Sequence, residues 1–158
     1  DLGFSSQGIA LEEVETVAEL GGECVCIAPA GGLPAEWRHV DLTRLAGRPF
    51  VSLRGSIQHR LDVLMADNPG GLDVVAEAGL SLSVSELVLR GLGISVVDPF
   101  TGVLHRQRGG LCLPFRPSVP FRVKALALGD TRLSAPAKDL LAHLQAAADA
   151  LHTVNIAT

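Results

Sequence analysis

The stretch Glu77-Ala-Gly-Leu-Ser-Leu-Ser-Val-Ser-Glu-Leu-Val-Leu-Arg-Gly-Leu-Gly-Ile-Ser-Val-Val-Asp-Pro-Phe100 decides the fold, because it contains a helix pattern, a stop and a strand pattern in succession. Leu82 and residues 87–89 predict a largely apolar helix of about two to three turns. We expect the helix to start at Ser81 or Ser83, since serine is a favoured helix N-cap.

The second half of this stretch predicts a buried strand. Gly91 and Gly93 can adopt the positive φ that ends a helix and releases a strand. Residues 94–97 are mostly β-branched, and Pro99 ends the strand because proline has no N–H for a sheet hydrogen bond. A helix start beside the carboxyl end of a strand offers N–H groups and a positive dipole end, which favour anions. The stretch therefore predicts a seat for a small anionic ligand.

Four parts of the sequence, taken in chain order, carry a family resemblance. They are Asp1-Leu-Gly-Phe4, Cys24-Val-Cys-Ile-Ala-Pro29 followed by Asp41-Leu-Thr-Arg-Leu-Ala-Gly-Arg-Pro-Phe-Val-Ser-Leu53, Leu87-Val-Leu-Arg-Gly-Leu-Gly-Ile-Ser-Val-Val-Asp-Pro-Phe100, and Leu113-Pro-Phe115. The set resembles the effector-binding domains of LysR-type transcriptional regulators, and its VDPF and LPF variants resemble the opine-responsive and basic-amino-acid-responsive members most. One departure is Ala30-Gly-Gly-Leu-Pro34, which lacks the histidine that members often carry in this turn.

The alternation of helices with short buried strands predicts mainly parallel α/β layers. The resemblance implies more: an α/β fold of two Rossmann-like lobes of the periplasmic-binding-protein type, joined by two crossings, with a ligand cleft between them. Lobe I would comprise residues 1–52 and 122–158, and lobe II residues 53–121. On this resemblance the first lobe is incomplete at its N-terminus, and a helix-turn-helix domain would precede it.

Composition argues against several classes of protein. The chain has 158 residues, of which 47% are hydrophobic and 19% charged, as is typical of a globular protein. A net charge of −4 argues against direct DNA binding, and no apolar run is long enough to span a membrane. Cys24 and Cys26 alternate along a predicted strand and so face opposite sides, and we interpret them as buried thiols in a reducing compartment.

Other segments have simpler patterns. Residues 14–20 fit a helix or a strand equally well, and the resemblance favours a strand. We expect a turn at Gly21-Gly22, a short helix capped by Asp41, a longer helix capped by Ser56, and a closing helix with Pro136 in its first turn.

No residue pattern predicts a metal centre or an enzyme. The five histidines, at positions 39, 59, 105, 143 and 152, are too far apart in sequence to share a helix face, so we assign them no metal. We expect an exposed polar segment containing His105, Arg106 and Arg108. The sequence has no phosphate-binding loop, no dinucleotide fingerprint after a strand and no nucleophile elbow, and we predict no cofactor.

Two serine-led helix starts, at Ser56 and at Ser81 or Ser83, each follow a strand. Ordinary N-capping and ligand binding explain this pattern about equally well. The resemblance favours binding, because these positions face the interlobe cleft in the family. Arg54 is either a carboxylate clamp or a solvated hinge charge. The ligand-binding set that the resemblance implies is Phe4, Ser5, Ser6, Ser52, Arg54, Gly55, Ser56, Gly79, Leu80, Ser81, Ser83, Asp98 and Phe100, with Asp98 and Glu77 as acidic partners for a cationic group.

The leading hypothesis is therefore the effector-sensing domain of a LysR-type regulator. It would bind a small carboxylate-bearing metabolite, such as an amino acid or an opine, without catalysis. The resemblance implies a cytoplasmic homodimer or tetramer that reaches DNA only through an upstream domain. Two alternatives stay open: an extracytoplasmic solute-binding protein of a transporter, and a small transferase or lyase on the same scaffold.

Overall fold

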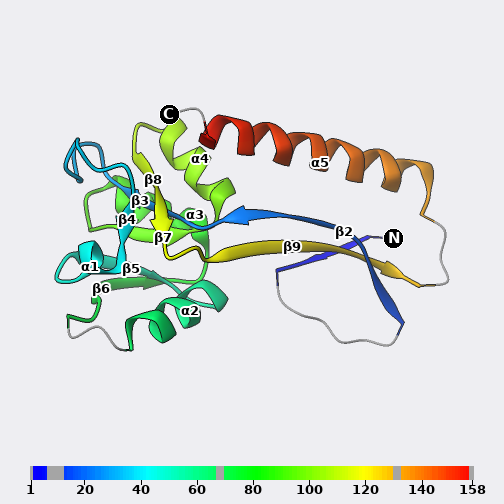
Figure 1. The fold of residues 1–158 in the computed structure, drawn as a ribbon. Coiled ribbons are helices and arrows are strands. Elements are labelled where there is room, and N and C mark those ends of the chain that lie inside the picture. Colours follow the sequence, from blue (N-terminus) through cyan, green and yellow to red (C-terminus); the bar gives the residue numbers. More distant parts are fainter. Residues whose placement is uncertain (1, 7–12, 67–69, 130–132, 157–158) are drawn as a thin grey trace. The chain divides into compact units, whose positions relative to one another are not determined.

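The chain forms two compact units, one made of Asp1–Gly22 with Phe121–Thr158 and the other of Glu23–Pro120. The computed structural model describes residues 2–6, 13–66, 70–129 and 133–156 (Figure 1). Each unit has its own strands and at least one helix, and each is described by itself.

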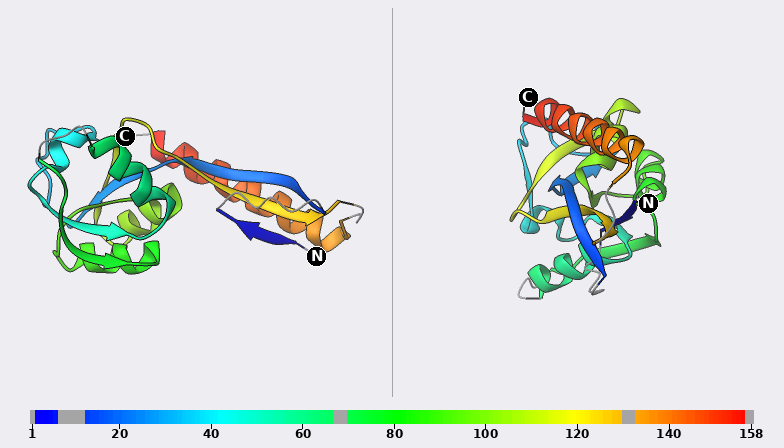
Figure 2. Two further views of the ribbon diagram at one scale, coloured as in Figure 1. Left: turned by 90° about the horizontal axis from the view of Figure 1, so that it is seen from below. Right: turned by 90° about the vertical axis from the view of Figure 1, so that its right-hand side faces the viewer.

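The first unit is a three-stranded sheet with one long helix. Its elements are β1 (Gly3–Ser5), β2 (Val14–Glu23), β9 (Pro120–Leu128) and α5 (Ala135–Ile156). The strand order is β1-β9-β2, and β1 runs antiparallel to β9 with Phe4 opposite Ala125. Ala125 and Ala127, two positions apart on β9, are buried, as expected for one face of a strand. Helix α5 extends along β2 and β9 (Figure 2).

The second unit has a four-stranded and a two-stranded sheet. The first contains β3 (Val25–Ala28), β4 (Val40–Asp41), β7 (Ser95–Val97) and β8 (Leu111–Arg116) in the order β4-β8-β3-β7. Strand β3 is antiparallel to both of its neighbours, and β4 is parallel to β8. The second sheet pairs β5 (Pro49–Leu53) with β6 (Asp73–Ala78) in parallel.

A parallel bridge between Phe50 and Ile94 joins these two sheets. The Val51 N–H donates to the Ile94 carbonyl, and the Ile94 N–H donates to the Pro49 carbonyl, both at 2.9 Å. Gly93 permits this approach, because a Cβ at that position would overlap the Pro49 carbonyl oxygen. Strands β6, β5 and β7 are consequently parallel neighbours whose carboxyl ends meet at one edge.

Each of these three strands leads directly into a helix. The helices of the second unit are α1 (Leu42–Leu45), α2 (Ser56–Met65), α3 (Ser81–Leu89) and α4 (Pro99–Gln107). Helix α2 buries Ile57, Leu61 and Met65, whose spacing of four residues places them on one face. The sheet contributes fully buried residues such as Phe50 and Ile27, so the core lies between the joined sheets and the helices.

The α/β class predicted from the sequence is confirmed, whereas three details differ. The strands are mixed in direction rather than mainly parallel, because β3 runs against both β7 and β8. Gly21 and Gly22 lie inside β2 and not in a turn. The segment after Phe100 is helix α4 rather than an exposed polar stretch, because Asp98 caps it and Pro99 occupies its first turn.

Residues 14–20 form a strand, as the resemblance favoured, and the closing helix begins at Ala135, near the expected Pro136. The two compact units divide the chain after Gly22 and after Pro120. The lobes expected from the sequence are residues 1–52 with 122–158 and residues 53–121. Their first boundary lies after residue 52 rather than after Gly22, and this division into lobes stays a prediction. Residues 25–28 belong with the second unit because β3 pairs with β7 and β8.

Replacing Gly93 by alanine should lower the free energy of unfolding by about 1–3 kcal/mol, the range for overpacking a tight site. The added methyl group would force β5 away from Ile94. Gly79→Ala is the matched control, since a Cβ there has no atom within 4 Å and stability should change by less than about 0.5 kcal/mol. Urea unfolding of both variants measures this, and equal stabilities would show that the junction tolerates a side chain.

Candidate functional site

Most of the predicted ligand residues lie at one edge of the second unit. Ser52 lies near the carboxyl end of β5 and residues 54–56 follow that strand, residues 79–83 follow β6, and residues 98–100 follow β7. Since these strands are parallel neighbours, their carboxyl ends and the first turns of α2, α3 and α4 meet there. In α/β sheets this edge is the usual place for a ligand. We call it the β5–β6–β7 edge.

Helices α2 and α3 begin without a side-chain cap. The N-cap of α2 is Gly55, whose φ of 129° favours glycine, and the N-cap of α3 is Leu80 in an extended conformation. Ser56 and Ser81 are each the first residue of their helix, as the expected helix starts required, but the expected capping roles of Ser56 and of Ser81 or Ser83 are wrong. The backbone N–H groups of both first turns accordingly have no side-chain cap.

The other helix starts are capped. An Asp41 oxygen accepts from the Arg44 N–H at the start of α1, as the sequence predicted. The Asp98 carboxylate caps the start of α4 by accepting from the Thr101 N–H, and at the start of α5 the Ser134 hydroxyl oxygen accepts from the Ala137 N–H. Uncapped starts are thus confined, among the described helices, to α2 and α3, which follow the paired strands β5 and β6.

Gln58 is a residue of this edge that sequence reasoning missed. Ser52 is buried, and its hydroxyl donates to the Gln58 side-chain oxygen at 2.9 Å. The Gln58 amide in turn donates to Asp62 at 2.7 Å on the next turn of α2. The sequence signal was available: Gln58 is the third residue of α2, where a side chain reaches back towards the helix start.

Arg54 and Glu77 form an ion pair across the ends of β5 and β6. Arg54 Nη2 and Nε lie 2.5 and 2.9 Å from the same Glu77 oxygen. The pairing of Leu53 with Ala78 brings the two residues together. Their side chains are 75% and 45% exposed, so water and a dissolved ion can reach both charges. The pair places one cation and one anion beside the two uncapped helices.

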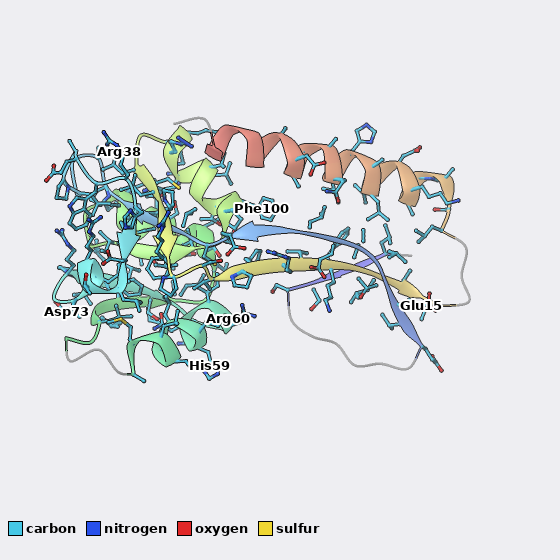
Figure 3. All side chains as sticks on the ribbon, in the orientation of Figure 1. Glu15, Arg38, His59, Arg60, Asp73 and Phe100 are labelled. Carbon is cyan, nitrogen blue, oxygen red and sulfur yellow. The ribbon has the colours of Figure 1, made fainter. Side chains whose placement is uncertain are left out.

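Asp98 and Phe100 lie at the start of α4, where Figure 3 labels Phe100. One Asp98 oxygen accepts from the Thr101 N–H at 2.9 Å and the other from the Thr101 hydroxyl at 2.8 Å. Asp98 is buried, and these contacts give it a structural role in capping the helix. Its predicted role as an acidic partner for a ligand stays a prediction.

Phe4, Ser5 and Ser6 belong to the first unit. Phe4 and Ser5 lie on β1 opposite Ala125 and Lys124, and Phe4 is about half exposed. Ser6 is exposed and follows the strand. Their membership of the ligand site also stays a prediction.

The histidines and cysteines form no metal centre in the described part of the chain. Cys24 and Cys26 are buried thiols, as predicted, and neither they nor Cys112 form a disulfide. His105, however, is fully buried and not exposed as expected. A helical spacing would have revealed this, because Thr101 and His105 lie four residues apart on the buried face of α4.

Comparison with known proteins identifies the family. Residues 1–149 match the sequence family described as the LysR substrate binding domain. The chain belongs to this family. It is 28% identical over 148 residues to the transcriptional activator protein LysR of Escherichia coli K12, covering 92% of the chain and 48% of LysR. It is 29% identical over 99 residues to the regulatory protein NocR of Agrobacterium tumefaciens T37, covering 61% of the chain and 33% of NocR.

A solved structure agrees with the fold of this LysR-family domain. The effector binding domain of QuiR in complex with shikimate superposes with a TM-score of 0.67 at 17% identity, covering 94% of the chain and 72% of that structure. The chain therefore has the fold of LysR effector-binding domains. It spans about half the length of LysR. None of the described helices is long and apolar enough to cross a membrane.

The contrast between capped and uncapped helices can be tested by replacing single side chains with alanine. Asp98→Ala should lower the free energy of unfolding by about 1–2 kcal/mol, because it removes the cap of α4. Ser56→Ala should change it by less than about 0.5 kcal/mol, since Ser56 caps nothing. Denaturant titration of the two variants provides the measurement, and a larger loss in Ser56→Ala would contradict this assignment of caps.

Proposed function

We propose that this LysR-family domain senses a small carboxylate-bearing metabolite, which it binds without catalysis at the β5–β6–β7 edge. The single observation that carries the proposal is the pair of adjacent helix starts, α2 and α3, whose first-turn N–H groups have no side-chain cap. Such groups, together with the positive ends of the helix dipoles, favour an anion. Ser56, Ser81 and Ser83 would add hydroxyl donors to the same anion.

The ion pair between Arg54 and Glu77 indicates which other charged group the ligand carries. A ligand carboxylate near α2 would compete with Glu77 for the exposed Arg54 side chain. A ligand that also carries an ammonium or guanidinium group would then leave Glu77 with a new partner. Amino-acid-like or opine-like ligands satisfy both charges, whereas a simple carboxylate satisfies one. The carboxylic acid shikimate in QuiR supports the anionic half of this proposal.

Calorimetric titration of the chain with arginine, ornithine, an opine and benzoate tests the proposal. Arg54→Gln should weaken binding of the amino-acid-like ligands by roughly ten- to a hundredfold, the effect of one lost charge-assisted hydrogen bond of about 1.5–3 kcal/mol. Ser81→Ala should weaken binding as well, through loss of a hydroxyl donor.

Arg90→Gln is the matched control, because Arg90 is similarly exposed and pairs with Glu86 near the opposite end of α3. Its affinities should equal those of the wild type. Tight benzoate binding without amino-acid binding would remove the opine-like assignment and leave the carboxylate site. Unchanged affinity in both Arg54→Gln and Ser81→Ala would place the ligand elsewhere.

We further propose that the chain acts within a longer cytoplasmic regulator, as a homodimer or tetramer whose DNA contacts come from another domain. Strand β6 supplies a surface suited to self-association. It is the last strand of its sheet, pairing only with β5 in the described structure, and Val74 and Val75 on it are about half exposed. An exposed apolar edge strand is a template for pairing with a second chain.

Val75→Asp should shift the assembly towards the monomer, because a charge at the edge opposes strand pairing. Val63→Asp is the control, since Val63 is also an exposed valine but lies on α2. Sedimentation equilibrium at micromolar concentrations measures both. A wild-type chain that is monomeric throughout this range, or equal dissociation of the two variants, would contradict the use of β6.

A further inference from the structure

His105 forms a buried hydrogen-bonded link between three elements of the second unit. Its Nε2 atom lies 2.9 Å from the Ala28 carbonyl oxygen on β3, and its Nδ1 atom lies 2.8 Å from the Ser85 hydroxyl oxygen on α3. The ring also lies against Gly110, where a Cβ would overlap it. One imidazole on α4 therefore ties that helix to β3 and to α3.

These partners define the protonation state of the ring. A carbonyl oxygen can only accept, so Nε2 carries the hydrogen that it donates to Ala28. Nδ1 of the neutral ring then accepts from the Ser85 hydroxyl. Protonation of Nδ1 would put two donors face to face, and the serine hydroxyl would have to turn away. It would also bury a positive charge in the core.

The charged groups on the neighbouring helices do not compensate that charge. Burial is the main cause that lowers the pKa of His105; the hydrogen bond to Ala28 opposes it, and the positive charge of Arg108 adds to it. Arg106, the next residue on α4, is a second cation. On α3, the Glu86 carboxylate is already held by Arg108 at 2.5 Å and by Arg90 at 3.1 Å.

The strands under the ring add no anion either. Cys26 on β3 and Cys112 on β8 are thiols, and Arg116 at the end of β8 is a further cation. Burial raises the pKa of Cys26, and it raises the pKa of Cys112 to about 11, so both thiols are neutral at physiological pH. The Asp98 carboxylate at the other end of α4 is occupied by Thr101.

We propose that His105 is a pH-sensitive latch, which holds α3 and α4 to β3 when neutral and releases them when protonated. This inference does not depend on the proposed function, although α3 begins at the β5–β6–β7 edge and its release would disturb that edge. The unfolded chain would bind the proton at an ordinary pKa of about 6.5, above that of the folded state. Stability is therefore full above pH 6.5 and falls as the pH drops below it, with the unfolding constant rising by up to about tenfold per pH unit.

Urea unfolding of the chain between pH 7.5 and pH 5 tests the latch. The wild type should lose stability below pH 6.5, whereas His105→Gln should show a nearly flat profile, since an amide can donate to Ala28 but does not titrate. His59→Gln, at an exposed histidine on α2 (Figure 3), should keep the wild-type profile. The carboxylates of Asp41 and Glu86 do not interfere, because hydrogen bonds from Thr43 and Arg108 lower the pKa of each, and their titration lies below this window.

A wild-type slope retained in His105→Gln would overturn the proposal. If that variant does not fold, the imidazole nitrogen resonances of the wild-type chain decide the question. The latch requires His105 to remain neutral, with its hydrogen on Nε2, down to a pH below the ordinary histidine pKa of about 6.5, because burial lowers the pKa of this ring. Titration of this ring at pH 6.5 or above would show that the core accepts the charge and that no latch exists.

Discussion

The hydrogen-bonded junction between β5 and Ile94 is the constraint on which the second unit depends. Two backbone hydrogen bonds of 2.9 Å make β5 and β7 parallel neighbours, and the Ser95 hydroxyl adds a third bond of 2.7 Å to the Val51 carbonyl. With β6 on the other side of β5, three strands end at one edge and three helices start there. The absence of a side chain at Gly93 is what lets the junction close.

Much of this fold could be predicted because it depends on local sequence patterns. The apolar run before Gly91, the β-branched residues after Gly93 and the stop at Pro99 each act over a few residues, and the observed α3 and β7 match them closely. Strand direction was missed because it depends on partners far along the chain. Val25 pairs with both Val97 and Pro114, a relation that no local pattern contains.

The site was partly predictable for the same reason. Placing serines at the starts of α2 and α3 required only helix periodicity and glycine stops, and the structure puts them there. Which residue caps a helix is decided by one backbone conformation, and Gly55 and Leu80 take that position instead. Helical position alone could have singled out Gln58 and the buried His105, but their partners, Ser52 on β5 and Ala28 on β3, depend on tertiary contacts that no local pattern contains.

The uncapped helices also resolve an apparent conflict between the charge of the chain and its proposed anionic ligand. A chain with a net charge of −4 repels anions at long range, but that repulsion is screened beyond about 8–10 Å at physiological salt. Within that distance the local groups dominate: two helix N-termini and the Arg54 guanidinium, whose partner Glu77 is exposed and replaceable. Each missing cap costs about 1 kcal/mol of stability. A bound carboxylate would satisfy the same N–H groups. The stabilisation that a side-chain cap would have given to folding would then contribute to the free energy of ligand binding.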